Sequence, residues 1–157
     1  MTNKEIKIAY QEFQGLDELD PSDRELAHAA IEATSQSYAP YSRFNVGAAV
    51  MFEDGEIVKG ANQENAAYPS GLCAERTALF YASASRPDKA MTSLAIAASQ
   101  EGKLCSIPAT PCGACRQVMA EYQTKSGRPM EILLVGAEKI WKFAKVDDLL
   151  PLIFDSI

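Results

Sequence analysis

The sequence has few features of nucleic-acid-binding or membrane proteins. Its net charge is −6 over 157 residues, and no cluster of Lys and Arg stands out, so we expect no nucleic-acid-binding surface. No apolar run approaches the ~18 residues needed to cross a bilayer, and the charged stretch at residues 1–5 lacks the apolar segment of a signal peptide. Internal repeats and linkers are also absent. These absences predict a single cytoplasmic domain over residues 1–157 that acts on a small neutral or cationic molecule without membrane or nucleic-acid partners.

Histidine is almost absent as well. The single His28 lies inside a predicted helix with no ligand partner at suitable spacing, so we interpret it as a residue of the helix surface or the edge of the core. The sequence does contain four cysteines. In a reducing compartment closely spaced cysteines bind metal more often than they form disulfides.

The hydrophobic pattern predicts a three-layer α/β/α domain with a mixed five-stranded sheet. A capping box of Ser22 and Glu25 predicts the start of the first helix. A β-hairpin follows over residues 45–62 and turns at Asp54-Gly55. Helices are expected over 73–85, with Leu79 and Phe80 in the core, and over 112–125. Strands are expected at 94–98, 132–135 and 141–143, and a short helix or turn at 146–150.

Residues 1–20 form an N-terminal extension to this domain. Ile6, Ile8 and Tyr10 alternate with polar or small residues. Such alternation predicts a strand or an extended arm.

Two cysteine motifs indicate the chemistry. They are Cys73-Ala74-Glu75-Arg76 and Pro111-Cys112-Gly113-Ala114-Cys115-Arg116. A catalytic zinc site has three protein ligands and one open position for water, and zinc deaminases combine a Glu that is not a ligand with a downstream Pro-Cys-x-x-Cys. The motifs therefore predict one zinc ion per chain, bound by Cys73, Cys112 and Cys115 at the starts of two helices, where the positive partial charge stabilises thiolates.

The residues beside the ligands have predicted roles of their own. Glu75 is close enough to a zinc-bound water to act as general acid and base, although a carboxylate in the first turn of a helix is also a common structural stabiliser. Three thiolates on one zinc ion leave a net charge of about −1. We expect Arg76 and Arg116 to offset that charge by donating hydrogen bonds to sulfur, the alternative for each being a surface ion pair.

The fourth cysteine, Cys105, defines a competing interpretation. If all four cysteines bound zinc, the site would be closed and structural. Because Cys105 lies outside both motifs and Glu75 would then have no role, we expect Cys105 to be a buried free thiol.

From about Tyr38 to Phe154 the sequence resembles a cytidine deaminase of the small, homotetrameric, three-cysteine class. The resemblance depends on five stretches in the same order as in the family: Tyr41-Ser42-Arg43-Phe44-Asn45-Val46-Gly47-Ala48-Ala49, Asn62-Gln63-Glu64-Asn65-Ala66-Ala67-Tyr68, Cys73-Ala74-Glu75-Arg76-Thr77-Ala78, Pro111-Cys112-Gly113-Ala114-Cys115-Arg116-Gln117 and Leu149-Leu150-Pro151. The chain departs from the family pattern in its N-terminal extension, in Gln63, where a hydrophobic residue is usual, and in the tail 152–154.

The resemblance implies further roles that the spacing does not show. Asn62 and Glu64 would hydrogen-bond the ribose 3′-hydroxyl, Phe44 would pack on the pyrimidine, and the backbone at Ala74 would contact the amide edge of the base. Glu75 would move protons to N3 and to the departing ammonia. The resemblance also implies a homotetramer with shared active sites, in which Phe154 reaches a neighbouring site and Tyr68 also crosses the interface.

The function we expect is zinc-dependent hydrolytic deamination of cytidine and 2′-deoxycytidine in pyrimidine salvage, with a nucleoside as the small-molecule substrate. One alternative is deamination of a modified cytosine nucleoside such as blasticidin S. Another is a non-catalytic module stabilised by zinc. Editing of RNA or DNA shares the zinc chemistry, but the acidic charge balance argues against it.

Overall fold

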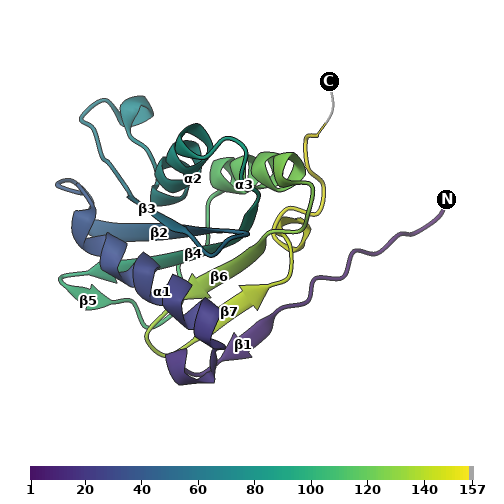
Figure 1. Cartoon of the computed structure of the whole chain (residues 1–157), viewed down its shortest axis with the longest axis horizontal. Coiled ribbons are helices and arrows are strands. Elements are labelled where there is room, and N and C mark those ends of the chain that lie inside the picture. The colour runs from purple at the N-terminus through teal and green to yellow at the C-terminus, as the bar shows by residue number, and fades with distance from the viewer. Residues whose placement is uncertain (156–157) are drawn as a thin grey trace.

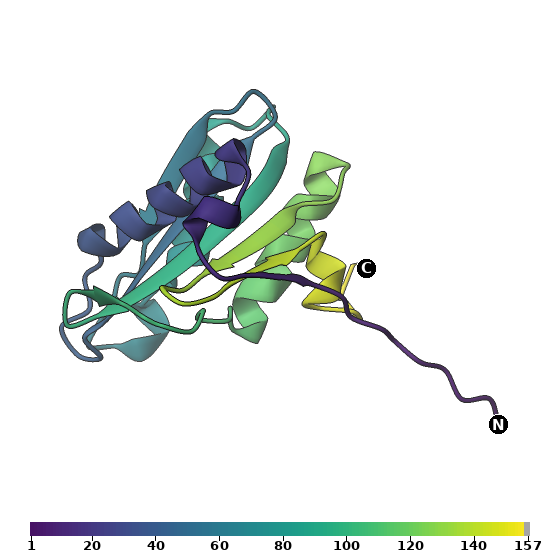
Figure 2. The same ribbon diagram turned by 90° about the horizontal axis from the view of Figure 1, so that it is seen from below.

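The computed structural model describes residues 1–155 as a sheet covered by helices on both faces (Figures 1 and 2). The strands are β1 (Gln11–Phe13), β2 (Phe44–Phe52), β3 (Ile57–Ala61), β4 (Met91–Gln100), β5 (Lys103–Leu104), β6 (Glu131–Val135) and β7 (Ile140–Phe143). The helices are α1 (Pro21–Ala33), α2 (Ala74–Ser85) and α3 (Gly113–Ser126), with short 3₁₀ turns at Leu16–Glu18, Thr34–Gln36, Tyr68–Ser70 and Val146–Asp148. Within residues 1–155 no helix has the length and apolar character needed to span a membrane.

The three-layer α/β/α class is confirmed, but the sheet has seven strands, not five. Its order is β1-β7-β6-β4-β2-β3, and β5 pairs with the end of β4. The five predicted strands are β7, β6, β4, β2 and β3, which are consecutive in the sheet, with β3 at one edge. β1 and β5 contain only three and two residues, which is too short for the alternation that predicts a strand. They are strands because they pair with β7 and β4.

Each face of the sheet has its own core. Leu26, Ala27 and Ala30 of α1 pack on one face with Ala49 and Leu133 of the strands. On the other face the α2 and α3 helices bury a larger cluster. That cluster includes Ala78, Leu79, Met119, Val50, Leu94, Ile96, Ile132 and Leu134. The continuous apolar run of β6 follows from this arrangement, because both faces of the strand are covered.

Two local predictions were wrong. Asp20, and not Ser22, caps α1, because its carboxylate accepts a hydrogen bond from the Asp23 N–H at 2.9 Å and Pro21 occupies the first turn. Phe80 is 42% exposed and meets Tyr122 edge-on at 6.3 Å between ring centroids. Phe80 therefore lies on the outer side of α2, while Leu79 beside it is fully buried as predicted.

The direction of the strands places both cysteine motifs at one edge of the sheet. β3 and β4 are each antiparallel to β2, and β6 is parallel to β4, so β3, β4 and β6 all end at the same edge. The α2 helix begins after β3 and the α3 helix begins after β4. Ligands in open α/β sheets bind outside the carboxyl ends of the strands, so a ligand site is expected at this edge.

The close approach of α2 to β3 requires glycine. A Cβ atom on Gly60 would lie 2.5 Å from the Ala78 nitrogen and 2.8 Å from its Cα. Both are backbone atoms of α2, which cannot move away without shifting the helix.

We therefore expect Gly60→Ala to lower the free energy of unfolding by about 1–3 kcal/mol, the usual cost of overpacking. Urea denaturation followed by circular dichroism measures this change. The control is Gly113→Ala, where an added Cβ meets nothing within 4 Å. If Gly60→Ala were as stable as the control, the helix would not be held against the strand as tightly as the structure indicates.

Candidate active site and metal centre

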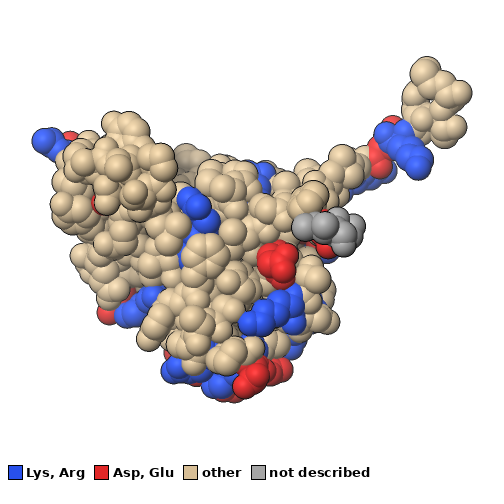
Figure 3. Space-filling view, turned by 90° about the horizontal axis from the view of Figure 1, so that it is seen from above, with Lys and Arg blue, Asp and Glu red and all other residues tan. Residues whose placement is uncertain are grey.

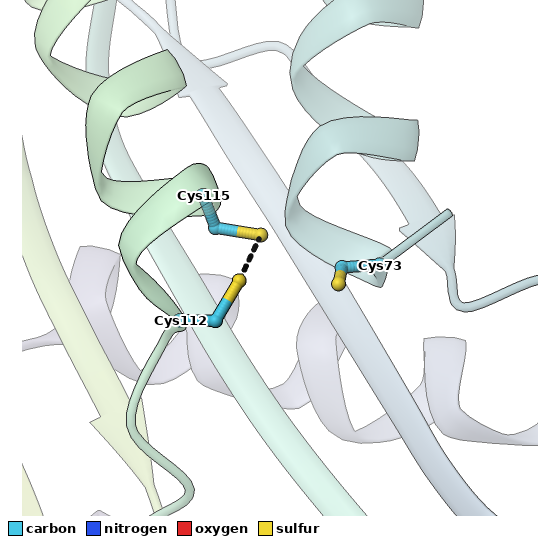
Figure 4. Close-up of side chains that lie close together, drawn as sticks. All are labelled: Cys73, Cys112 and Cys115. Carbon is cyan, nitrogen blue, oxygen red and sulfur yellow. Dashed lines mark hydrogen bonds between the residues drawn. The ribbon is translucent and has the colours of Figure 1, made fainter. Parts of the chain in front are cut away.

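Three cysteines from two helix N-termini converge at this edge (Figure 4). Cys73 is the N-cap of α2, Cys112 is the N-cap of α3, and Cys115 lies in the first turn of α3. Their sulfur atoms all lie within 4.8 Å of one another, and the Cys112 and Cys115 sulfurs are 3.5 Å apart. All three are free thiols.

Hydrogen bonds within the cluster shift the pKa values of Cys73 and Cys115 in opposite directions. The Cys115 thiol, followed by the Arg76 guanidinium, lowers the pKa of Cys73 to about 5, although burial acts in the opposite direction. The pKa of Cys115 is raised, first by its hydrogen bond to Cys73 and then by burial. Cys73 is therefore the group that carries negative charge most readily, and it lies at a helix N-terminus, where that charge is stabilised.

The residues present fit a zinc ion. Sulfur ligands at about 2.3 Å from one tetrahedral zinc lie about 3.8 Å apart, and the three sulfurs, within 4.8 Å of one another, are close to that spacing. They come from two backbone segments that are fixed by α2 and α3. Three ligands leave the fourth tetrahedral position for a water molecule or a substrate, which is the composition of a catalytic site.

Glu75 is a buried carboxyl beside the cluster. Its residue is only 6% exposed, and burial raises its pKa above the ordinary value, with the negative charge of Cys73 acting in the same direction. The backbone and the Cys115 side chain provide hydrogen bonds that lower the pKa by smaller amounts. A carboxyl whose pKa is raised toward neutrality is suited to proton transfer.

The two arginines have different partners. Arg76 donates from Nη2 to the Cys73 sulfur at 3.6 Å, as expected, and its Nε is the one buried side-chain polar atom of residues 1–155 without a hydrogen-bond partner. Arg116 donates instead to the carbonyl oxygens of Pro111 and Leu149, at 2.8 and 2.7 Å. The prediction that Arg116 bonds a sulfur is therefore not met. The Arg116 side chain links the backbone that precedes Cys112 to the C-terminal segment.

A pocket of about 550 Å³ opens beside Cys73 and Arg76. Of the predicted substrate contacts it brings together Asn62, Glu64 and Tyr68, whereas Phe44, Ala74 and Phe154 are not among its lining residues. The other lining residues are Tyr41, Ser42, Gln63, Asn65, Gly71 and Leu72.

Asn62 and Glu64 both bond to the protein in this structure. The Asn62 side chain accepts from the Ser37 hydroxyl at 2.5 Å and the Val46 N–H at 2.9 Å, and it donates to the Phe44 carbonyl at 2.9 Å. Phe44 thus contributes to the site through its backbone. One N–H of the Asn62 amide is left without a partner in these contacts.

Glu64 accepts from the backbone N–H groups of Tyr41 and Ser42, at 2.9 and 3.2 Å, and from the Ser42 hydroxyl. The Ser42 hydroxyl and these N–H groups hold its pKa below the ordinary value. The carboxylate therefore stays ionised and holds the loop at Tyr41 and Ser42 in the pocket wall. The neighbouring Arg43 has a positive φ of 57°, a conformation that non-glycine residues rarely adopt.

Phe154 lies away from the pocket of its own chain. It is 68% exposed, and the Gln117 side chain of α3 donates to its carbonyl at 2.7 Å and accepts from its N–H at 3.4 Å. Tyr68 is 83% exposed although it lines the pocket. Both rings are open to contact by another molecule.

The sequence pattern missed the backbone parts of the site. Gln63 and Leu72 exchange two backbone hydrogen bonds of 2.9 Å each, which close the loop between β3 and α2 into one wall of the pocket. Side-chain patterns carry no signal for such a bridge. Tyr41 and Ser42 lie within a stretch of family resemblance, which is the one signal that marked them.

The fold and this cluster define the class of zinc-binding deaminase domains, with sulfur ligands from two helix N-termini and an adjacent buried glutamate. Comparison with known proteins is more specific. Residues 20–127 match the family described as the cytidine and deoxycytidylate deaminase zinc-binding region, and the chain belongs to this family.

Individual relatives agree with this assignment. The chain is 50% identical over 97 residues to a cytidine deaminase of Halalkalibacterium halodurans, covering 61% of this chain and 68% of the relative. It is also 50% identical over 91 residues to a cytidine deaminase of Sporosarcina psychrophila, covering 58% and 62%. The crystal structure of cytidine deaminase from Burkholderia pseudomallei superposes with a TM-score of 0.70 at 39% identity, covering 83% of this chain and 97% of that one.

Cys105 lies apart from the metal cluster, in the segment between β5 and α3. Its N–H donates to the Ala98 carbonyl and its carbonyl accepts from the Ala137 N–H, both at 2.9 Å, and its sulfur is not part of the group of three. It is a half-buried free thiol.

We therefore expect Cys105→Ser to retain about one zinc ion per chain, as expected for a site of three protein ligands, and Cys112→Ser to lose most of it. Zinc content is measured by mass spectrometry after dialysis against a weak chelator. Loss of zinc from Cys105→Ser would instead indicate a closed site of four cysteines.

Proposed function

We propose that this chain catalyses the hydrolytic deamination of cytidine and 2′-deoxycytidine, giving uridine or 2′-deoxyuridine and ammonia. The observation that carries the proposal is the position of Glu75, a buried carboxyl of raised pKa two residues after Cys73 in the first turn of α2, beside the three sulfurs. A structural zinc site has no use for such a group. The names of the similar proteins point to the same substrate class.

In this proposal Cys73, Cys112 and Cys115 bind the zinc ion. When bound, the ion supplies Lewis-acid activation of a water molecule at neutral pH. Because three thiolates make the centre electron-rich, the hydrogen bond from Arg76 to the Cys73 sulfur withdraws charge and favours that activation.

Glu75 moves the protons. It takes one proton from the attacking water and delivers it to N3 of the pyrimidine, so that C4 accepts the oxygen without a charge building on the ring. It then takes the proton of the new C4 hydroxyl and passes it to the amino group, so that C4 becomes a carbonyl as the C4–N bond breaks and ammonia leaves. Burial raises the pKa of the carboxyl, which makes Glu75 a stronger proton acceptor than an exposed carboxylate.

The pocket wall orients the nucleoside. The free N–H of Asn62 and the Glu64 carboxylate are proposed to contact the ribose 3′-hydroxyl, with Glu64 keeping its bonds to Tyr41 and Ser42. The pocket volume of about 550 Å³ lies within the range typical of small-molecule sites. The contacts of Phe44 and Ala74 with the base are also part of the proposal, although neither residue lines the pocket in this structure.

A homotetramer with shared active sites is part of the proposal. Figure 3 views the molecule from the side of α2 and α3, and much of this face lacks charged residues. Phe80 and Tyr81 of α2 are 42% and 60% exposed, and apolar exposure of this kind marks interaction sites. The exposed rings of Tyr68 and Phe154 would then enter neighbouring pockets. We propose pyrimidine salvage in the cytoplasm as the setting.

Glu75→Gln is the first test of the mechanism. It keeps the size of the side chain and removes the proton carrier, so we expect kcat for cytidine to fall by about 10²–10⁴-fold with zinc content unchanged. The decrease in absorbance on deamination measures kcat, and metal analysis of the same samples is the control. An active Glu75→Gln protein would remove Glu75 from the mechanism.

The ribose contact of Glu64 is tested with two substrates. Glu64→Ala should lower kcat/KM for cytidine by an amount equivalent to about 1.5–3 kcal/mol, the contribution of a charged hydrogen bond. The loss should be much smaller for 2′,3′-dideoxycytidine, which lacks the 3′-hydroxyl. Ser42→Ala is the matched control, because it loosens the loop and leaves the carboxylate. Equal losses on both substrates would mean that Glu64 acts only through the loop.

A further inference from the structure

Residues 1–10 form an extended arm that runs away from the body of the protein (Figures 1 and 2). Within residues 1–155 no hydrogen bond or ion pair joins residues 1–9 of the arm to any other part. Ile6, Ile8 and Tyr10 are 59%, 52% and 52% exposed. Because alternate residues of an extended chain share a side, the arm presents Ile6 and Ile8 to solvent in one row with the half-exposed Tyr10.

The base of the arm is held firmly. The Tyr10 ring lies 5.7 Å from the Trp141 ring and 5.2 Å from the Phe143 ring, between centroids. Glu12 accepts hydrogen bonds from Trp141 Nε1 at 2.9 Å and Lys139 Nζ at 3.0 Å. These contacts fix the direction in which the arm leaves the sheet.

The arm also continues an open sheet edge. β1 pairs with β7 on one side and is the terminal strand of the sheet, so its other side presents unpaired backbone groups. Such an edge is a template for pairing with another chain. An exposed row of apolar side chains on the same segment makes that pairing favourable.

We propose that the arm pairs with the arm of a second copy of this chain, as two antiparallel strands related by a two-fold axis at Ile8. In such an interface each contact occurs twice, because residue i meets j and j meets i. Ile8 then meets Ile8, and Ile6 meets Tyr10. Lys4 meets Glu12 at both ends, and on the other side Lys7 meets Ala9.

The charges of the arm select this register. Moving the axis to residue 7 places Lys7 opposite Lys7, and like charges directly opposite are destabilising. Moving it to residue 9 places Ile6 opposite Glu12, an apolar residue against a carboxylate. The axis at Ile8 pairs apolar with apolar residues and Lys4 with Glu12, so the sequence of the arm is complementary to itself.

The contact is separate from the proposed catalytic site. No residue of the arm lines the pocket beside Cys73. Changes in the arm should therefore alter assembly and leave kcat/KM for cytidine unchanged, which distinguishes failure of this inference from failure of the proposed function.

Sedimentation velocity on the zinc-loaded full chain tests the assembly. Because the arm contact is separate from the contacts of the proposed tetramer, paired arms join one tetramer to another. Ile8→Asp places two carboxylates on the axis, and we expect the mass of the assembly to fall to that of the tetramer. Ala9→Asp is the matched control, since it adds the same charge opposite Lys7 and should keep the full mass. If Ile8→Asp and the unchanged chain have equal masses, the proposal is overturned.

Cysteine cross-linking tests the register. In a Cys105→Ser background, Ile8→Cys should form a covalent dimer on mild oxidation, because directly opposed residues lie within the Cα separation of a disulfide. Ile6→Cys should not, since the two copies of residue 6 would be about 13 Å apart along the strands at a rise of about 3.3 Å per residue. Equal cross-linking of both variants would overturn the paired arrangement.

Discussion

The site depends on the convergence of three sulfur atoms within 4.8 Å of one another. Thiolates repel each other, so nothing in the cysteines themselves holds them together. The strand directions do so, because β3 and β4 end at one edge and the helices that follow begin there. Both helix N-termini then direct their positive partial charge at the cluster, and Arg76 adds a full positive charge at the Cys73 sulfur.

Burial of Glu75 follows from the same arrangement. The residue lies in the first turn of α2, whose apolar side, Ala78, Leu79 and Ala82, packs on the sheet with full burial. The helix can lie this close to β3 because Gly60 has no side chain. The packing of α2 thus keeps the Glu75 carboxyl buried beside the sulfurs, and this burial raises its pKa.

The two ends of the chain contrast with this centre. The C-terminal segment folds back on its own α3, where Gln117 and Arg116 bond the backbone of Phe154 and Leu149. The N-terminal arm extends away from the body on the N-terminal side of Tyr10, and residues 1–9 have no backbone partner among the residues described. The segment from Leu149 to Phe154 is therefore held by its own chain, whereas in our proposal the arm finds its partner in a second chain.

Much of this protein was predictable from the sequence alone. Periodicity located the hairpin, the two helices that begin at the cysteine motifs and the central strands, because α2, α3 and β6 bury apolar residues in one core. The group of three cysteines was predicted from the two motifs, since zinc deaminases combine thiolate ligands at such spacing with a nearby glutamate. The catalytic role of Glu75 stays a prediction. The single-domain extent of residues 1–157 stays a prediction.

Only the tertiary structure decided the remaining features, because they depend on backbone groups and on segments that are distant in sequence. Arg116 bonds carbonyl oxygens and not sulfur, and Glu64 holds the loop at Ser42. The short strands β1 and β5 exist through pairing with their neighbours, and Asp20 displaced Ser22 as the cap of α1. Local patterns report which residue types are present, whereas these contacts depend on which backbone atoms the fold brings within reach.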